Sequence, residues 1–153
     1  MKEMTPFNSL DVASYIANRC HAKGIHYNNT KIQKLLYCCY GSLLAVKGVR
    51  LCDEHPRAWQ YGPVFPRVFN YIKKGKDLRG RNLNLNAPSD VLTLIDDVLD
   101  AFGRYTATTL SNWTHQKDSP WDRALNELEG EPNGFIPDDL IGEYFKNHVV
   151  RES

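Results

Sequence analysis

The strongest suggestion of catalytic chemistry in the sequence is a histidine that stands between a hydroxyl and a carboxylate. His115 lies between Ser111 and Asp118 in the chain. A serine nucleophile needs a base within hydrogen-bonding reach and donors for the oxyanion, commonly on a sharp turn between a strand and a helix. The sequence contains no Gly-x-Ser-x-Gly motif to supply that turn. We therefore expect no catalytic residue, and we expect His115 to end a helix, where an imidazole can meet free carbonyl groups.

The cysteines and histidines offer only part of a metal site. Cys52-x-x-His55 has half of the ligand spacing of a structural zinc site, which needs four ligands. Cys20-His21 could complete the set only by an accident of tertiary folding. The adjacent pair Cys38-Cys39 is a poor framework for disulfide bonds, so we expect the 4 cysteines to be buried or half-buried thiols. No metal site is predicted.

A phosphate-binding loop is not recognisable either. Gly75-Lys76 and Gly80-Arg81 do not stand between a strand and a helix, which is the context that a glycine-rich phosphate loop requires. We expect no cofactor, and we predict that the protein is not an enzyme.

A rigid aromatic corner runs from Trp59 to Pro66, with the sequence Trp-Gln-Tyr-Gly-Pro-Val-Phe-Pro. Each proline fixes φ and biases the residue before it toward extended geometry, while Gly62 can adopt conformations that a side chain would forbid. The corner is either a joint that orients its neighbouring elements or a recognition surface, and its position favours the joint. As a surface it would offer aromatic and arginine anchors. The candidate contact residues here are Arg57, Trp59, Tyr61 and Arg67.

Apolar periodicity predicts that most of the chain is helical. Stripes with helical spacing run through residues 9–23, 30–47, 89–102 and 138–149, and shorter helices are expected at 106–115 and from Ser119-Pro120. The helix that begins at Thr30 should open with a capping box completed by Gln33, and Gly48 should end it.

Residues 49–62 change to extended character. The pieces 49–52 and 58–61 surround a turn at 53–56, which predicts a small β-hairpin near residues 49–61. A third helix is expected to begin at Pro63, because proline is favoured in the first turn of a helix. The predicted fold is mainly α: a compact bundle of about six or seven helices with a small hairpin, forming a single domain over residues 1–153.

The near-neutral net charge hides a division between the two halves of the chain. Residues 1–76 carry 12 lysines and arginines against 4 acidic residues, whereas residues 77–153 carry 7 against 14. Either the two halves neutralise each other across one fold, or the basic half binds an acidic partner. Nucleic acid is the less favoured partner, because the lysines are dispersed and no arginine-rich run occurs.

No apolar run has the length of a membrane span, and the first residues lack the apolar core of a signal peptide. We therefore expect a cytoplasmic protein without a membrane association.

Three segments of the sequence together resemble one known family. Thr30–Tyr37 resembles the "KLQKLLYY" opening of the SocA/GepA-like family, also called the Panacea domain, and Ala58–Val64 is similar to its "AWKYGPV" signature. Later residues resemble its "LS…TH…PW" pattern in the same order. The matching pieces of that last pattern are Leu110-Ser111, Thr114-His115 and Ser119-Pro120-Trp121.

The resemblance implies a compact, mainly helical domain that acts as an antitoxin. Its partner would be a cognate protein toxin, encoded by the adjacent gene and neutralised by direct binding. One branch of the family instead delivers its toxin to a ClpXP-type protease, and a nucleic-acid-binding regulator is the third alternative. By the resemblance, His115 joins Trp59 and Tyr61 as a possible partner-binding residue. The structural signature positions are Thr30, Gln33, Lys34, Leu35, Tyr37, Gly62, Pro63, Pro120 and Trp121.

Overall fold

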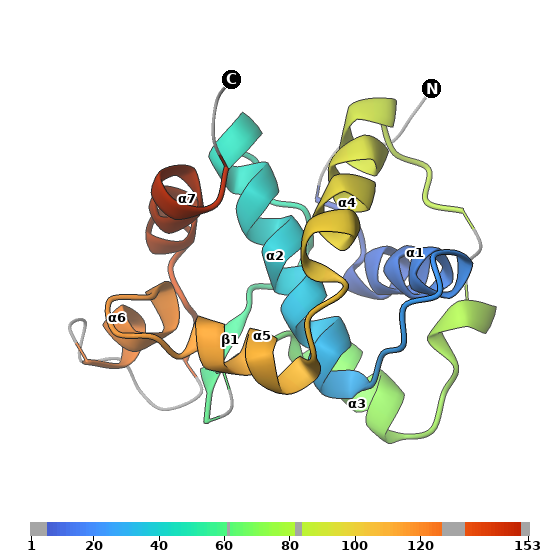
Figure 1. Ribbon diagram of the computed structural model, residues 1–153, viewed down its shortest axis with the longest axis horizontal. Helices are drawn as coiled ribbons and strands as arrows, with labels where there is room; N and C mark the ends of the chain where they lie inside the picture. Colours follow the sequence, from blue (N-terminus) through green and yellow to red (C-terminus); the bar gives the residue numbers. More distant parts are fainter. Residues whose placement is uncertain (1–5, 61, 82–83, 127–133, 151–153) are drawn as a thin grey trace.

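The computed structural model describes residues 6–60, 62–81, 84–126 and 134–150. Over these residues the chain forms seven α-helices, one 3₁₀ helix and a two-stranded antiparallel sheet, which confirms the predicted mainly α fold (Figure 1). In chain order the elements are α1 (Ser9–Ala22), α2 (Asn29–Lys47), β1 (Arg57–Trp59), β2 (Gly62–Val64), α3 (Pro66–Lys73), η1 (Leu78–Gly80), α4 (Ser89–Phe102), α5 (Ala107–Thr114), α6 (Pro120–Asn126) and α7 (Asp138–His148).

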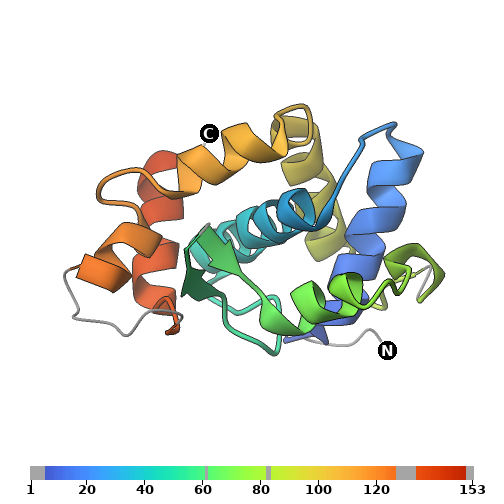
Figure 2. The ribbon, with the colours of Figure 1, turned by 90° about the horizontal axis from the view of Figure 1, so that it is seen from below.

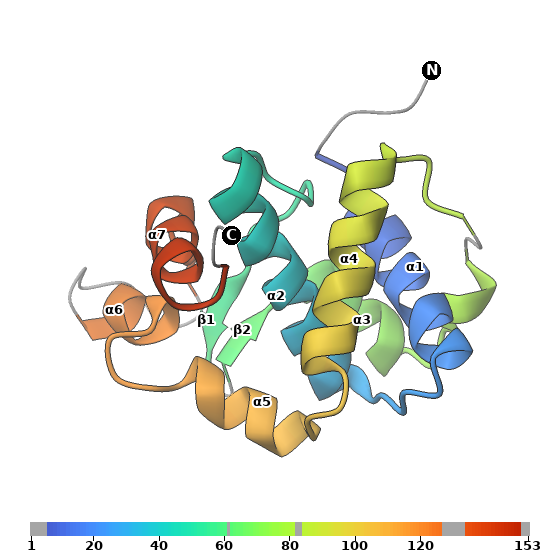
Figure 3. The same ribbon diagram turned by 45° about the horizontal axis from the view of Figure 1, so that its top comes forward.

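Helix α2 is the centre of the fold. Every residue from Lys31 to Leu43 is buried, so this helix is enclosed on all sides rather than along one stripe. Helices α4 and α7 flank it, and α1, α3, α5 and β2 also contact it (Figure 3). Leu35 and Tyr37 point into this core, where the ring of Tyr37 packs edge-on against Phe145 of α7.

The contact between α2 and α7 depends on a glycine. A Cβ atom placed on Gly41 would overlap the ring of Phe145. The two helices can therefore approach this closely only because position 41 carries no side chain.

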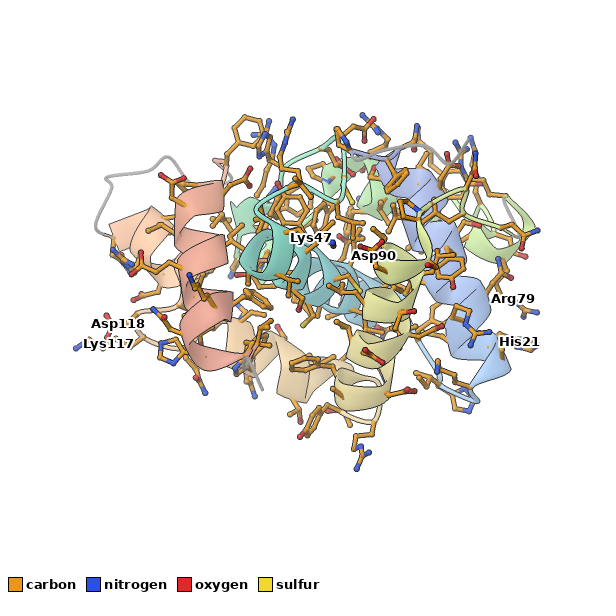
Figure 4. All side chains as sticks on the ribbon, turned by 90° about the horizontal axis from the view of Figure 1, so that it is seen from above. His21, Lys47, Arg79, Asp90, Lys117 and Asp118 are labelled. Atoms are coloured by element: carbon orange, nitrogen blue, oxygen red, sulfur yellow. The ribbon has the colours of Figure 1, made fainter. Side chains whose placement is uncertain are left out.

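Ion pairs join the basic first half of the chain to the acidic second half. Arg19 of α1 binds Asp96 at 2.8 Å, and Lys23 binds Asp100 at 2.8 Å. Lys47 and Asp90 form a third pair at 2.6 Å, between the end of α2 and the start of α4 (Figure 4). Because these groups are partly exposed, each pair adds little to stability. Their pattern supports the interpretation in which the two halves neutralise each other.

The small hairpin is present, but its strands lie further along the chain than the pattern of 49–52 and 58–61 indicates. Arg57 pairs with Val64 and Trp59 with Gly62, so the first strand ends at Trp59 and the turn begins at Gln60. Pro63, which we expected to begin a helix, lies inside β2, and α3 begins at Pro66 instead. Proline has no N–H to donate, but the hydrogen bond that this position makes to α2 needs only its carbonyl oxygen, which accepts from Lys34. Proline is therefore tolerated at this position of the strand.

The start of α2 also differs from the prediction. The helix begins at Asn29, and the side chain of Asn28 caps it by accepting a hydrogen bond from the N–H of Lys31. Thr30 is therefore inside the helix, and the predicted capping box with Gln33 is wrong. Gln33 instead accepts a hydrogen bond from the main-chain N–H of Phe65, which is distant in the sequence. The predicted end at Gly48 is confirmed by its left-handed backbone, with φ 67°.

No helix within the described ranges is long and apolar enough to cross a membrane.

Candidate partner-binding site

Several of the signature residues meet at the hairpin. The signature residues come from the first half of α2, from β2 and from the junction between α5 and α6, segments that can be followed in Figure 2. Although these segments are far apart in sequence, side chains of Lys34, His115 and Trp121 approach main-chain carbonyl groups of the hairpin from two sides. Gln33 binds the N–H of Phe65 directly after β2, and Thr114 and Ser119 hold the α5–α6 junction in place. We call this arrangement the hairpin clasp. Its side chains are those of Gln33, Lys34, Thr114, His115, Ser119 and Trp121.

The α2 side of the clasp is formed by two buried polar side chains. Gln33 is 1% exposed, and its Oε1 accepts a hydrogen bond of 2.7 Å from the N–H of Phe65. Its Nε2 donates to Oδ1 of Asn29 at 3.0 Å. The Nζ of Lys34, also 1% exposed, donates to the carbonyl oxygen of Pro63 at 3.0 Å. Burial lowers the pKa of Lys34 to about 8, because the charged ammonium has lost most of its hydration.

Gly62 occupies the point where both sides of the clasp meet. Its φ is +112°, a conformation that residues with a side chain rarely adopt. A Cβ atom at this position would lie 2.8 Å from Oγ1 of Thr114 and 3.1 Å from Nζ of Lys34. The glycine of the Gly-Pro pair is therefore required by both backbone conformation and space.

The α5–α6 side of the clasp holds the turn of the hairpin. Nε1 of Trp121 donates to the carbonyl oxygen of Trp59 at 2.6 Å. Nε2 of His115 lies 2.9 Å from the carbonyl oxygen of Gln60, and Nδ1 lies 2.6 Å from that of Ser111. The rings of His115 and Trp121 pack edge-to-face with centroids 4.4 Å apart. These two side chains thus fix consecutive carbonyl groups at the end of β1.

Ser119 ties the two helices of this side together. Its Oγ donates to the carbonyl oxygen of Thr114 at 3.0 Å and accepts from the N–H of Asp122 at 3.2 Å. It therefore closes the end of α5 and caps the start of α6, where Pro120 is buried. This confirms the expected start of α6 at Ser119-Pro120.

The geometry around His115 is that of a helix end. His115 is the C-cap of α5, as the sequence predicts, and both ring nitrogens face main-chain carbonyl groups rather than the Ser111 hydroxyl. Asp118 lies in the exposed connection to α6, next to Lys117 (Figure 4). Its main-chain N–H donates to Oδ2 of Asp122 at 2.9 Å. Main-chain or ring atoms of Ser111, His115 and Asp118 thus form hydrogen bonds that stabilise the end of α5 and the connection to α6.

The thiols behave as the sequence predicts. Cys20, Cys38, Cys39 and Cys52 are all free and buried. Burial raises the pKa of each thiol, that of Cys20 to about 11, which keeps the thiols protonated and unreactive near neutral pH. Among the described residues no group of three or more histidine, cysteine or acidic side chains is placed to hold a metal ion.

The structure separates the predicted contact residues. Arg57 and Trp59 share one face of β1, which lies beside the clasp. Arg67 lies on α3, where its Nη1 binds Oδ1 of Asp53 at 2.7 Å and Oγ of Ser9 at 3.3 Å. Tyr61 lies outside the described residues.

One residue beside β1 was missed by the sequence analysis. Phe135 is 56% exposed and forms an isolated antiparallel bridge with Arg57. The available signal was an apolar Phe-Ile pair before the proline and the two acids at the start of α7, a pattern that a short extended segment would produce. The sequence could not show that this segment pairs with β1.

Comparisons with known proteins agree with the resemblance read from the motifs. Residues 32–122 match the family described as Antitoxin SocA-like, Panacea domain. The chain is also 31% identical over 129 residues to Antitoxin SocA of Caulobacter vibrioides (strain NA1000 / CB15N), a match that covers 75% of this chain and 69% of that protein. No solved structure matches the chain significantly. The matched range includes the clasp side chains from both α2 and the α5–α6 junction.

Proposed function

Because the chain belongs to the SocA-like Panacea family of antitoxins, we propose that it neutralises a cognate protein toxin by direct protein–protein binding. The family match is the observation that carries this proposal. The toxin is the product of the adjacent gene, and inhibition is stoichiometric, without a reaction catalysed by this chain.

The geometry of the clasp supports a binding role. The polar groups of Lys34, His115, Ser119 and Trp121 face main-chain carbonyl groups of the hairpin and of α5, so they hold a shape rather than surround a substrate. A rigid shape favours protein binding, because less conformational entropy is lost when the complex forms. His115 in this proposal supports the contact surface from behind, while Arg57 and Trp59 face the partner.

Co-expression tests the proposal directly. The product of the adjacent gene is induced alone and together with this protein, and growth is followed. We expect growth arrest in the first case, growth in the second, and a complex of the two proteins in equal amounts after purification. A neighbouring product that is harmless alone, or that stays toxic beside this protein, contradicts the proposal.

Toxin half-life separates inhibition from delivery to a protease. A direct inhibitor leaves the half-life of its toxin unchanged or lengthens it, whereas an adaptor for a ClpXP-type protease shortens it. The measurement is a chase after translation is stopped, in cells with and without the protease. We expect neutralisation in both strains and no protease-dependent loss of the toxin.

A further inference from the structure

The outer face of β1 presents two side chains away from the core. Side chains along a strand alternate between its two faces. Ala58 is 3% exposed and points inward, so Arg57 and Trp59 on either side of it point outward. The clasp binds carbonyl groups at the end of this strand and in its turn, and the side chains of Arg57 and Trp59 are half-buried, so each keeps part of its surface open to solvent.

Residues 134–136 extend this face from the other edge of β1. The N–H of Ala58 donates to the carbonyl oxygen of Gly134 at 2.8 Å, and the N–H of Ile136 donates to that of Pro56 at 3.0 Å. Ile136 is fully buried, so the alternation places Phe135 on the outer face. The guanidinium carbon of Arg57 lies 4.1 Å from the centre of the Phe135 ring.

Further aromatic and cationic groups continue the face on both sides. The ring of Trp59 packs edge-on against Phe69 of α3, with centroids 5.1 Å apart, and the His55 ring packs in the same way against Phe135 at 5.3 Å. We call this set the β1 stripe: His55, Arg57, Trp59, Phe69 and Phe135.

A cation lies at each end of the β1 stripe. Nη1 of Arg50 lies 2.7 Å from Nε2 of His55, and Nζ of Lys73 lies 5.9 Å from the centre of the Phe69 ring. With Arg57 in the middle, three cations thus run along one aromatic surface. The carboxylate of Asp138 lies beside the His55 end of the stripe: its Oδ1 accepts a hydrogen bond of 2.6 Å from Tyr40 and lies 3.5 Å from Nδ1 of His55. The charge of the stripe therefore rests on Arg50, Arg57 and Lys73.

We propose that the β1 stripe is the surface that binds the toxin, and that it receives an acidic segment of the toxin carrying at least one apolar side chain. This inference rests on the proposed function. Tryptophan and arginine are the residue types that most often dominate binding energy at protein interfaces. The charge of the stripe favours an acidic partner and accelerates its association. The clasp behind β1 holds the stripe in place before the partner arrives.

The ring geometry favours a protein over a nucleic acid as the occupant. Single-stranded nucleic acid binds by stacking its bases on open aromatic faces. Here the rings meet edge to face, with interplanar angles of 70° for Trp59–Phe69 and 64° for His55–Phe135. Arg57 covers a face of Phe135. In each of these pairs the edge of one ring covers a face of the other, and cations lie beside the rings, an arrangement that suits carboxylates and apolar side chains.

Two substitutions in the stripe and two matched controls test the proposal. Phe135→Ala removes the most exposed aromatic ring, and Arg57→Glu reverses the central charge. Tyr105→Ala is the control for the first, because Tyr105 is 45% exposed and belongs to the connection between α4 and α5. Arg104→Glu, also at an exposed position in that connection, is the control for the second. Circular dichroism and thermal unfolding establish that each variant is folded.

The measurements are growth of cells co-expressing the adjacent gene product, and the affinity of that purified product for each variant by titration calorimetry. We expect each stripe variant to bind at least about tenfold more weakly and to protect poorly, while both controls match the wild type. Stripe variants that are folded and bind like the wild type overturn the assignment of the surface.

The same experiment separates this proposal from the proposed function. If wild-type protein fails to protect the cells, the antitoxin function itself is wrong. If wild-type protein protects and the stripe variants also protect, only the surface is wrong. Loss of binding after nuclease treatment, with an affinity that falls steeply with salt, would show that the stripe binds nucleic acid and overturns the proposal.

Discussion

Lys34→Met tests whether α2 holds a charged ammonium against the hairpin. The lysine side chain is 1% exposed, and burial lowers the pKa of its ammonium from 10.5 to about 8. Methionine has a similar length and volume but no charge, so the variant removes the buried charge with little change of shape. It also removes the hydrogen bond to the carbonyl oxygen of Pro63. Removing the buried charge stabilises the folded protein, whereas removing the hydrogen bond destabilises it. Only the effect of the charge depends on pH.

The sign of the pH dependence follows from the protons bound in each state. Between pH 8 and pH 10.5, Lys34 is protonated in the unfolded chain and largely neutral in the folded protein. The unfolded state therefore binds more protons, and raising the pH stabilises the folded state through this group. Below pH 8 both states are protonated, and the cost of burying the charge is present in full. The difference between 10.5 and about 8 corresponds to roughly 3 kcal/mol, at about 1.36 kcal/mol per pKa unit.

Other buried groups titrate over the same range with the opposite sign. Burial raises the pKa of the Cys20 thiol to about 11 and that of the Tyr37 hydroxyl well above its usual value. These groups stabilise the folded state fully below their unfolded pKa values and lose that contribution as the pH rises. Because the wild type and the Lys34→Met variant share them, the difference between the two proteins isolates Lys34.

The assay is urea unfolding at several pH values from 7 to 10.5, followed by the fluorescence of the 3 tryptophans. The free energy of unfolding of the wild type, minus that of Lys34→Met, should rise by roughly 3 kcal/mol across this range. Lys74→Met, at an exposed position after α3, gives the baseline for removing a lysine charge. A difference between wild type and Lys34→Met that stays constant, or that falls, refutes the reasoning.

Three further substitutions test the packing, each by urea unfolding. Gly62→Ala should destabilise the protein by about 2 kcal/mol or more, because the new Cβ would meet Thr114 at a φ that alanine avoids; a wild-type midpoint would contradict this. Trp121→Phe keeps an aromatic side chain but replaces the indole with a smaller phenyl ring that has no N–H, and so loses the hydrogen bond to the carbonyl oxygen of Trp59. We expect a loss of about 1–3 kcal/mol, whereas an unchanged stability would mean that the bond is dispensable. Gly41→Ala should cost about 1–3 kcal/mol, because the new Cβ overlaps the ring of Phe145. Adding Phe145→Leu in the same chain should recover part of this lost stability. If the stability changes of the two substitutions were strictly additive, the overlap would not be their cause.

Signals that act within a few residues were sufficient to predict most helix ends. Gly48 ends α2 in a left-handed conformation, and Ser119 caps α6, because such effects depend on neighbouring backbone groups alone. Gln33 shows where local reasoning fails. Its position after Thr30 suits a capping box, but its amide binds the N–H of Phe65, which only the folded chain brings near.

The surface of β1 could be predicted only in part. Arg57 and Trp59 were identified because they are prominent residue types beside a rigid corner. Phe135 and Phe69 were not, since they reach the strand through pairing and packing with segments distant in sequence. The position of the hairpin was mispredicted for a related reason. The local preference of proline for the first turn of a helix suggested that a helix begins at Pro63, but Pro63 lies in β2, where its carbonyl oxygen accepts a hydrogen bond from the buried Lys34 of α2.

Lys34, His115 and Trp121 of the clasp bind the hairpin through its main-chain carbonyl groups rather than through its side chains. A carbonyl group is the same whatever residue carries it, so the clasp places no demand on the identity of the outward side chains of β1 or of Gln60, which is exposed in the turn. Substitutions at these positions can therefore change which partner is bound while the supporting frame stays constant. The outward side chains of the hairpin can therefore vary while its backbone position is maintained. A chain built this way can acquire a new binding specificity through a few surface substitutions, without a change in its core.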